Sequence, residues 1–263
     1  KRLPCLLEQM AEKGRLENIR AVGASTRPRA VEGSYMPCFL AGEGQGRGIA
    51  AGLGLPFYAD SHQQGHLAAA AWSAGRLDLL DSSFLAWHLS GGTTELLLVR
   101  PEGTSVSAEI IGGTSDLSAG QLIDRTGVLL GLQFPAGKAL DGLYAQADAC
   151  YEPRVKIKEL TFSLSGMENQ VKALADEGER PANIARFAID AISNVVWRVT
   201  QEAQRRYPGL PVLCSGGVAS NSQLRAGLIH ICGAICAKPQ YSTDNAMGTA
   251  ILTWRAAQAE GKL

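Results

Sequence analysis

A predicted strand followed by Ser-Gly-Gly occurs twice in this chain, and this repeat constrains the fold more than any other feature. The first copy ends at Ser90-Gly91-Gly92 and the second at Ser215-Gly216-Gly217. Glycines let the backbone approach a ligand, and a helix expected from Ser222 would offer unpaired N–H groups and its positive dipole end to an anion. A single turn of this kind is most often structural. Two copies favour phosphate binding and suggest duplicated halves whose loops face one cleft.

Half of the chain's four histidines lie in His62-Gln63-Gln64-Gly65-His66. Ser61 and Gln64 form a capping-box pattern, which predicts a helix beginning at His62 and places both imidazoles on one helix face. Neutral imidazoles are common ligands of transition metals, so the two histidines can bind one metal ion together. A third ligand, expected to be a carboxylate, must come from elsewhere in the chain. The alternative is a chance pair on a surface helix.

The bulk composition describes a globular chain. With 263 residues, 46% apolar and 19% charged, it can bury a large core in one or two domains. Its 25 basic and 25 acidic residues lack the surplus of a stand-alone nucleic-acid binder, so an RNA substrate would need a local patch or a partner. No apolar run is long enough to cross a membrane. The start, Lys1-Arg2-Leu3-Pro4, lacks a signal peptide and an initiator Met, so we expect a truncated N-terminus.

The six cysteines are scattered, and only Cys232 and Cys236 lie close together. Their spacing does not match CxxC. In a chain of this size, isolated cysteines are interpreted as small buried hydrophobic residues in a reducing cytosol.

Periodicity predicts alternating helices and strands, an α/β pattern. Residues 25–56 mix turn signals with a Gly/Ala helix near Ile49 and stay undecided. Strands are predicted at 19–24, 57–59, 84–89, 95–100, 105–111 and 210–214, and those at 84–89, 95–100 and 105–111 are predicted to form a β-meander. Helices are predicted at 3–13, 62–72, 117–130 and 137–147, from Asn183 to before Pro208, from Ser222, and at 246–257 behind a Thr243-Asp244-Asn245 cap.

The order of these motifs resembles the TsaD/Gcp family. The matching residues are His62-x-x-Gly65-His66, Ser90-Gly91-Gly92-Thr93-Thr94, Gly112-Gly113-Thr114-x-Asp116, Ala119-Gly120-x-x-x-Asp124, Phe162-Ser163-Leu164-Ser165-Gly166, Gly216-Gly217-Val218-Ala219-Ser220-Asn221 and Thr243-Asp244-Asn245-Ala246-Met247. The resemblance implies the actin-like ATPase (ASKHA, ribonuclease H-like) fold, with two related lobes around a nucleotide cleft. We expect one lobe at residues 1–84, with the histidine helix, and the other at 85–263, with a helical insertion at 112–182.

The resemblance also implies a function. Members of the family transfer a threonylcarbamoyl group from its adenylate to an adenosine of tRNA, in a cytoplasmic complex with TsaB and TsaE. Carried over to this chain, it makes His62, His66 and Asp244 ligands of one divalent metal ion, iron or zinc. ATP or threonylcarbamoyl-adenylate would contact His88, Leu89, Ser90, Gly91 and Gly92 with its phosphates or carbamoyl group, and Asp124, Gly137 and Asp141 with its adenosine. Asn221 would contact the nucleotide as well.

Simpler roles stay open for several of these residues. Asp244 and Asn221 are also good helix caps, Asp124 could be a surface helix residue, and His88 and His230 suit structural positions.

Departures from the family pattern point to a divergent paralogue. Nothing before Lys1 matches the family's first strand-turn-strand with Gly-Ile-Asp-Thr-Ser. The family's Thr-x-Gly-Pro-Gly-Leu stretch is replaced by Ser25-Thr26-Arg27-Pro28-Arg29, and its Gly-Gly-Pro is replaced by Ala136-Gly137-Lys138. Gln121 replaces the usual Glu, and Arg125 replaces the usual Lys. Two other functions are the alternatives. A metal-dependent O-sialoglycoprotein endopeptidase would need a glutamate base where Gln63 stands. A non-catalytic nucleotide-binding regulatory partner is the other.

Overall fold

The computed structural model describes residues 3–263, which form two compact units. The first unit comprises the residues up to Ala68, the segment Glu102–Ser105 and the C-terminal segment Ala246–Leu263. The second comprises Ala69–Pro101 and Val106–Asn245. The units therefore interleave along the chain, whereas the sequence led us to expect consecutive lobes at 1–84 and 85–263. None of the helices within the described residues is both long and apolar enough to cross a membrane.

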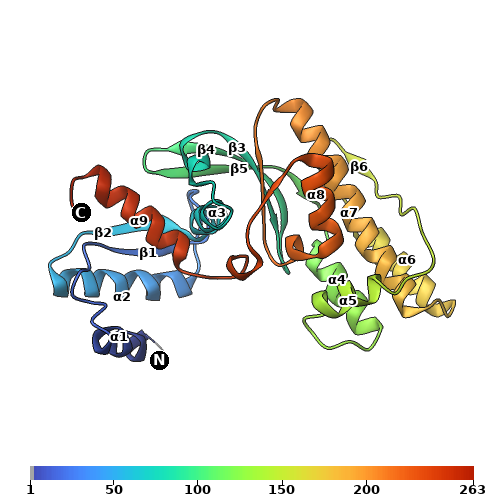
Figure 1. The fold of residues 1–263 in the computed structure, drawn as a ribbon, viewed down its shortest axis with the longest axis horizontal. Helices are drawn as coiled ribbons and strands as arrows, with labels where there is room; N and C mark the ends of the chain where they lie inside the picture. The colour runs from blue at the N-terminus through green and yellow to red at the C-terminus, as the bar shows by residue number, and fades with distance from the viewer. Residues whose placement is uncertain (1–2) are drawn as a thin grey trace. The chain divides into compact units, whose positions relative to one another are not determined.

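The first unit is built on two parallel strands, β1 (Val22–Arg27) and β2 (Phe57–Ser61). The connection between parallel strands needs a crossover, and here the crossover is α2 (Pro37–Leu53). Figure 1 shows α2 on one face of these strands and α9 (Met247–Ala259) on the other. The other helices of this unit are α1 (Leu3–Glu12) and the first part of α3 (His62–Ser73).

α2 lies within residues 25–56, where turn signals and a Gly/Ala helix pattern overlap in the sequence. Its first residue is Pro37, and Gly54 follows its end with a left-handed φ of 66°. A glycine inside the helix serves packing: a Cβ on Gly46 would lie 2.8 Å from the Phe57 ring and 3.3 Å from the Ala24 Cβ. α2 therefore packs closely against both strands at Gly46. Because glycine lowers helix propensity, the sequence pattern alone does not predict this helix.

The second unit is organised around a seven-stranded sheet with the order β6-β7-β5-β4-β3-β8-β9. β3 pairs antiparallel with β4 and parallel with β8, so the predicted β-meander and the second glycine-loop strand share one sheet. The strands are β3 (Phe84–Leu89), β4 (Thr94–Glu102), β5 (Ser105–Thr114), β6 (Ile157–Lys158), β7 (Thr161–Phe162), β8 (Val212–Ser215) and β9 (Ile235–Cys236).

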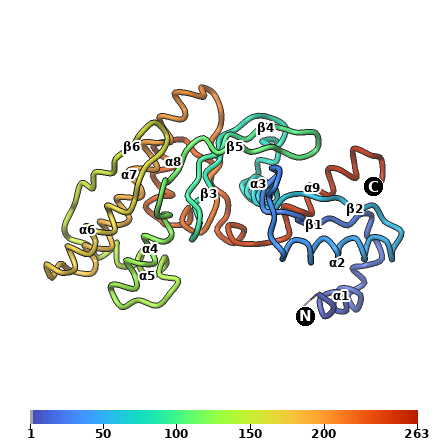
Figure 2. The backbone as a smooth tube through the Cα atoms, turned by 180° about the vertical axis from the view of Figure 1, so that it is seen from behind, coloured from blue at the N-terminus to red at the C-terminus, as the bar shows by residue number. Residues whose placement is uncertain are grey.

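The helices of this unit build its hydrophobic core around α7. They are α4 (Ala119–Leu129), α5 (Gly137–Tyr144), α6 (Ser165–Asp176), α7 (Pro181–Arg206) and α8 (Ser222–Cys232), with short 3₁₀ turns at Leu77–Asp81, Val218–Ser220 and Pro239–Tyr241. α7 contacts α4, α5, α6 and α8, which lie around it in Figure 2. Trp87 of β3, fully buried, donates from Nε1 to Thr200 Oγ1 of α7 at 2.8 Å. The expected insertion at 112–182 contains three of these helices but also β6 and β7, and β7 pairs with β5 within the sheet.

Candidate functional site

The histidine pair stands at the start of α3, as the sequence predicts. Ser61 donates its N–H to Gln64 Oε1 at 2.7 Å, and Gln64 donates its N–H to Ser61 Oγ at 3.2 Å, which is the predicted capping box. The Nε2 atoms of His62 and His66 lie 3.1 Å apart, and both rings are half-buried. Two nitrogens each about 2.0–2.1 Å from a tetrahedral ion would be separated by roughly 3.3 Å. The spacing of the pair therefore fits two ligands of one metal ion.

Gly65 brings the C-terminal helix of the same unit close to this pair. A Cβ on Gly65 would lie 3.2 Å from Thr249 Oγ1 of α9, and the Thr249 hydroxyl also lies 3.3 Å from Ser25 Oγ of β1. The first turns of α3 and α9 are thus in contact between the two histidines.

Asp244 lies three residues before Met247, the first residue of α9, but it does not cap this helix. The capping position is Ala246, which makes no side-chain cap hydrogen bond, so the predicted Thr243-Asp244-Asn245 cap is wrong. Asn245 instead donates from Nδ2 to the carbonyl oxygens of Thr243 at 2.8 Å and Tyr241 at 3.3 Å. These bonds shape the loop that carries the exposed Asp244 carboxylate.

The two Ser-Gly-Gly loops follow neighbouring parallel strands. His88 of β3 and Ser215 of β8 are register partners, so both loops leave the same edge of one sheet. A Cβ on Gly216, whose φ is 100°, would lie 2.1 Å from the Leu89 carbonyl oxygen. Only glycine allows this approach. The two loops follow adjacent strands of one sheet, so the expectation that they belong to duplicated halves is wrong. The expectation that both loops face one cavity is confirmed, because Gly91 and Gly217 both line it.

That cavity has a volume of about 490 Å³ and lies entirely within the second unit. Both glycine loops contribute to it, together with α4, α5 and the turn before α8. Its lining residues are Gly91, Gly120, Ile123, Asp124, Pro135, Gly137, Lys138, Asp141, Gly217, Val218, Ser220, Asn221 and Thr243.

Five of the nine residues predicted to bind nucleotide line this cavity: Gly91, Asp124, Gly137, Asp141 and Asn221. The other four, His88, Leu89, Ser90 and Gly92, are not part of its wall. Leu89 is fully buried in the hydrophobic core, because it lies on a strand covered on both faces. Ser90 instead shapes the turn by accepting the Thr93 N–H at 3.1 Å.

The carboxylates on the cavity wall already hold structural hydrogen bonds. Asp124 accepts the Ala136 N–H at 2.8 Å and so fixes the start of α5. Asp141 accepts from Asn221 Nδ2 at 2.9 Å, from Ser222 Oγ at 2.8 Å and from the Ser222 N–H at 3.2 Å. The carboxylate oxygens of Asp124 and Asp141 can each accept further hydrogen bonds, which the hydroxyl groups of a nucleoside could donate.

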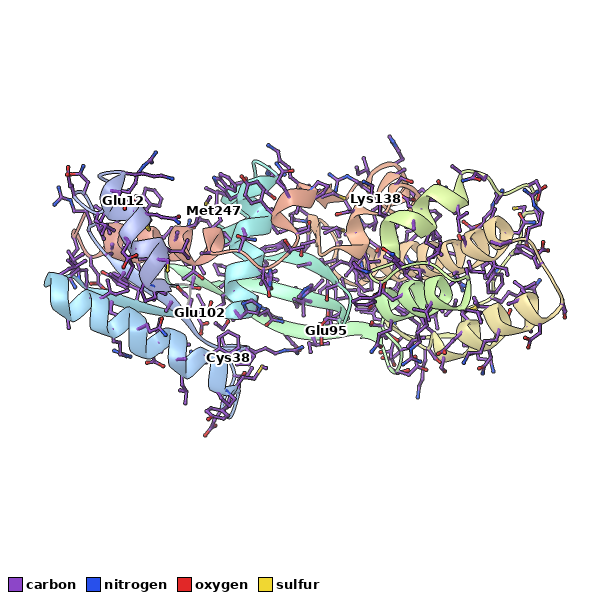
Figure 3. All side chains as sticks on the ribbon, turned by 90° about the horizontal axis from the view of Figure 1, so that it is seen from below. Glu12, Cys38, Glu95, Glu102, Lys138 and Met247 are labelled. Carbon is purple, nitrogen blue, oxygen red and sulfur yellow. The ribbon has the colours of Figure 1, made fainter. Side chains whose placement is uncertain are left out.

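The first turn of α8 is not an open anion site, although the sequence suggested unpaired N–H groups there. Asn221 caps the helix by accepting the Leu224 N–H at 3.0 Å, and the Ser222 N–H is bonded to Asp141. Lys138, labelled in Figure 3 on the first turn of α5, is an exposed cation on the cavity wall. In the sequence, Lys138 is visible only as a departure from a family motif.

Comparison with solved structures defines the class of this protein. A full-length HypF structure in a phosphate- and nucleotide-bound form covers 96% of this chain with a TM-score of 0.65 and 15% identity, over 41% of its own length. A Clostridium difficile activator of 2-hydroxyisocaproyl-CoA dehydratase with bound ADPNP covers 100% of the chain with a TM-score of 0.52 and 12% identity, over 84% of its own length. The chain has the actin-like ATPase fold predicted from its sequence.

Sequence comparison identifies the family. The model of the TsaD family, described as tRNA N6-adenosine threonylcarbamoyltransferase, matches residues 2–251. A tRNA N6-adenosine threonylcarbamoyltransferase of Streptococcus pneumoniae (strain ATCC 700669 / Spain 23F-1) is 33% identical over 235 residues, which are 85% of this chain and 66% of the relative. The chain belongs to the TsaD family and spans just under two thirds of the length of the curated relatives it matches.

Proposed function

We propose that the cavity of the second unit binds ATP or threonylcarbamoyl-adenylate. The observation that carries this proposal is the meeting of five predicted nucleotide-binding residues, from four separate segments, on one cavity wall. Its volume of about 490 Å³ falls in the usual range for small-molecule sites. The HypF structure is in a phosphate- and nucleotide-bound form, and the dehydratase activator has bound ADPNP.

The glycine loops and Lys138 suit the phosphate end of such a ligand. Gly91 and Gly217 carry no side chain that would keep a phosphate from the backbone, and a Cβ on either would meet open space. Lys138 supplies a positive charge on the same wall. Asp124 and Asp141 suit ribose hydroxyls, because a carboxylate oxygen can accept more than one hydrogen bond.

A divalent metal ion, iron or zinc, is proposed at His62, His66 and Asp244, a set of two imidazoles and one carboxylate. The 3.1 Å separation of the imidazole Nε2 atoms supports it. Thr249 lies against Gly65, and Asp244 is only five residues before Thr249, so the chain can carry its carboxylate to the histidines. When bound, such an ion would offset phosphate charge and polarise a carbonyl group.

The activity proposed for the complete protein is transfer of a threonylcarbamoyl group to an adenosine of tRNA, in the cytoplasm. The family of the chain supports this assignment. TsaB-like and TsaE-like partners are part of the same proposal. The contribution of this chain would be to orient the adenylate between its glycine loops and to neutralise the phosphate with Lys138.

Metal analysis tests the proposed ion. We expect the purified chain to hold about one equivalent of iron or zinc, and His62→Ala or Asp244→Ala to lose it. His230→Ala is the matched control, because His230 is exposed on α8 and outside the proposed ligand set. Equal metal content in all four proteins would remove the site.

Nucleotide binding and tRNA modification separate the remaining functions. A transferase should bind ATP and modify tRNA when its partners are added, whereas a regulatory partner should bind ATP without turnover. The endopeptidase gains no support, because Gln63 cannot take a proton as a metalloprotease base would. Peptide hydrolysis lost in His66→Ala would restore that alternative.

A further inference from the structure

Cys214 and Cys236 are register partners on the neighbouring parallel strands β8 and β9. Neighbouring strands lie about 4.8 Å apart, and the Cα atoms of a disulfide lie roughly 4.4–6.8 Å apart. Register partners on parallel strands point their side chains to the same face of the sheet, so the two thiols lie side by side on one face. The backbone therefore holds this pair at a separation that a disulfide bond can span.

The two thiols differ in access and acidity. Cys214 is 1% exposed on an inner strand, whereas Cys236 is half-buried on the edge strand of the sheet. The hydrogen bond to Cys236 and burial both raise the pKa of Cys214. The hydrogen bond from Cys214 lowers the pKa of Cys236, and the Arg225 guanidinium, which donates to the Cys236 carbonyl oxygen at 3.4 Å, lowers it further. Cys236 is thus the thiol placed to react first.

The remaining cysteines are not arranged as partners. Cys232 donates its thiol to the Trp197 carbonyl oxygen at 3.7 Å, and burial raises its pKa to about 11. Cys5 and Cys38 belong to the first unit, where Cys38 is in the first turn of α2 (Figure 3). Cys150 is exposed in the segment between α5 and β6.

We propose that Cys214 and Cys236 close to an intramolecular disulfide when the chain meets a small disulfide oxidant such as oxidised glutathione. The Cys236 thiolate attacks one sulfur of the oxidant, breaks its S–S bond and releases one glutathione thiolate. Cys214 then loses its proton to solvent, and its sulfur attacks the Cys236 sulfur and releases the second glutathione. The protein loses two hydrogen atoms, and one oxidised glutathione becomes two reduced molecules.

This bond would form one residue before the Ser215-Gly216-Gly217 loop. It would tie edge strand β9 to β8 at the base of a loop that lines the cavity. The proposal depends only on the thiol pair and not on what the cavity binds.

The test uses the full chain in buffers with a graded ratio of reduced to oxidised glutathione, followed by acid quenching, alkylation and peptide mapping. We expect a Cys214–Cys236 peptide pair and a loss of two free thiols beyond the glutathione adducts of exposed cysteines. In Cys214→Ala, Cys236 should accumulate as a mixed disulfide, because no neighbouring thiol can resolve it. Dithiothreitol should reverse both products.

Cys232→Ala is the matched control and should keep the Cys214–Cys236 pair. Cys236→Ser changes a half-buried edge position and should leave Cys214 reduced in a chain whose circular dichroism is unchanged. The proposal is overturned if Cys5, Cys38 and Cys150 all become glutathionylated while Cys214 and Cys236 stay reduced. A Cys232–Cys236 bond in the wild type would overturn it equally.

Discussion

Asn221 donates its side-chain amide to Asp141 across 2.9 Å and thereby joins the start of α8 to α5. The same residue caps α8 through the Leu224 N–H, and Asp141 also holds the backbone and hydroxyl of Ser222. Two residues predicted to contact a nucleotide therefore also set the position of the cavity wall. Their substitution should change stability as well as binding.

Asn221→Ala should lower the free energy of unfolding by roughly 1–3 kcal/mol, because it removes a helix cap and a hydrogen bond to a carboxylate. Urea unfolding followed by circular dichroism measures the change. Asn18→Ala, at an exposed position in the first unit, should stay within about 0.5 kcal/mol of wild type. Equal stability of the two variants would show that the Asn221–Asp141 link contributes nothing.

Gly120→Ala should disrupt the first glycine loop. A Cβ there would lie 2.4 Å from the Gly91 Cα and 2.5 Å from the Ser90 carbonyl oxygen, which are backbone atoms that cannot move aside alone. We expect a loss of about 1–3 kcal/mol in unfolding free energy together with weaker ATP binding. Gly142→Ala is the control: it lies inside α5 with nothing within 4 Å of the added Cβ, and should gain up to about 1 kcal/mol.

Local signals in the sequence were sufficient for several elements. The capping box at Ser61 and Gln64, the β-meander and the long apolar period of α7 each depend on residues close in sequence, and the structure confirms them. The ordered glycine motifs also located five residues of the cavity wall. These features need no knowledge of distant strand pairing.

What the sequence could not supply depends on contacts between distant segments. The pairing of β3 with β8 places both Ser-Gly-Gly loops on one sheet edge, and no local pattern distinguishes this from two separate halves. The same holds for Cys214 and Cys236, which are 22 residues apart and meet only because β9 pairs with β8. Asn221 and Asp141 satisfy the α8 N–H groups that a local reading leaves open to an anion.

Asp190 should make stability depend on pH. Burial raises its pKa above the ordinary value of 3.8, although Tyr144 donates to it at 2.9 Å and Arg186 lies beside it. A raised pKa in the folded state means that the folded chain holds the Asp190 proton more tightly than the unfolded chain does. The protonated Asp190 therefore contributes fully to folding stability below pH 3.8, and this contribution is lost as the pH rises through the folded-state pKa. Asp190→Asn, which stays neutral, should therefore gain stability relative to wild type near pH 7 but not below pH 3.8.

Urea unfolding of both proteins at several pH values measures this difference. Asp176→Asn, at an exposed position on α6, is the control and should show no such pH-dependent gain. A gain for Asp190→Asn that is the same at every pH would contradict the role of burial.

Lys138→Ala should weaken ATP binding by roughly 10- to 100-fold, since a hydrogen bond to a charged group contributes about 1.5–3 kcal/mol and each 1.4 kcal/mol is a factor of ten. Isothermal titration calorimetry with ATP and with adenosine separates the two ends of the ligand: adenosine affinity should stay unchanged, because the lost charge acts on the phosphates. Lys156→Ala removes the same charge from an exposed position outside the cavity and should bind ATP as wild type does. If Lys138→Ala lost adenosine and ATP affinity equally, the residue would act through the cavity wall. If it lost neither, the phosphate end of the ligand would lie elsewhere.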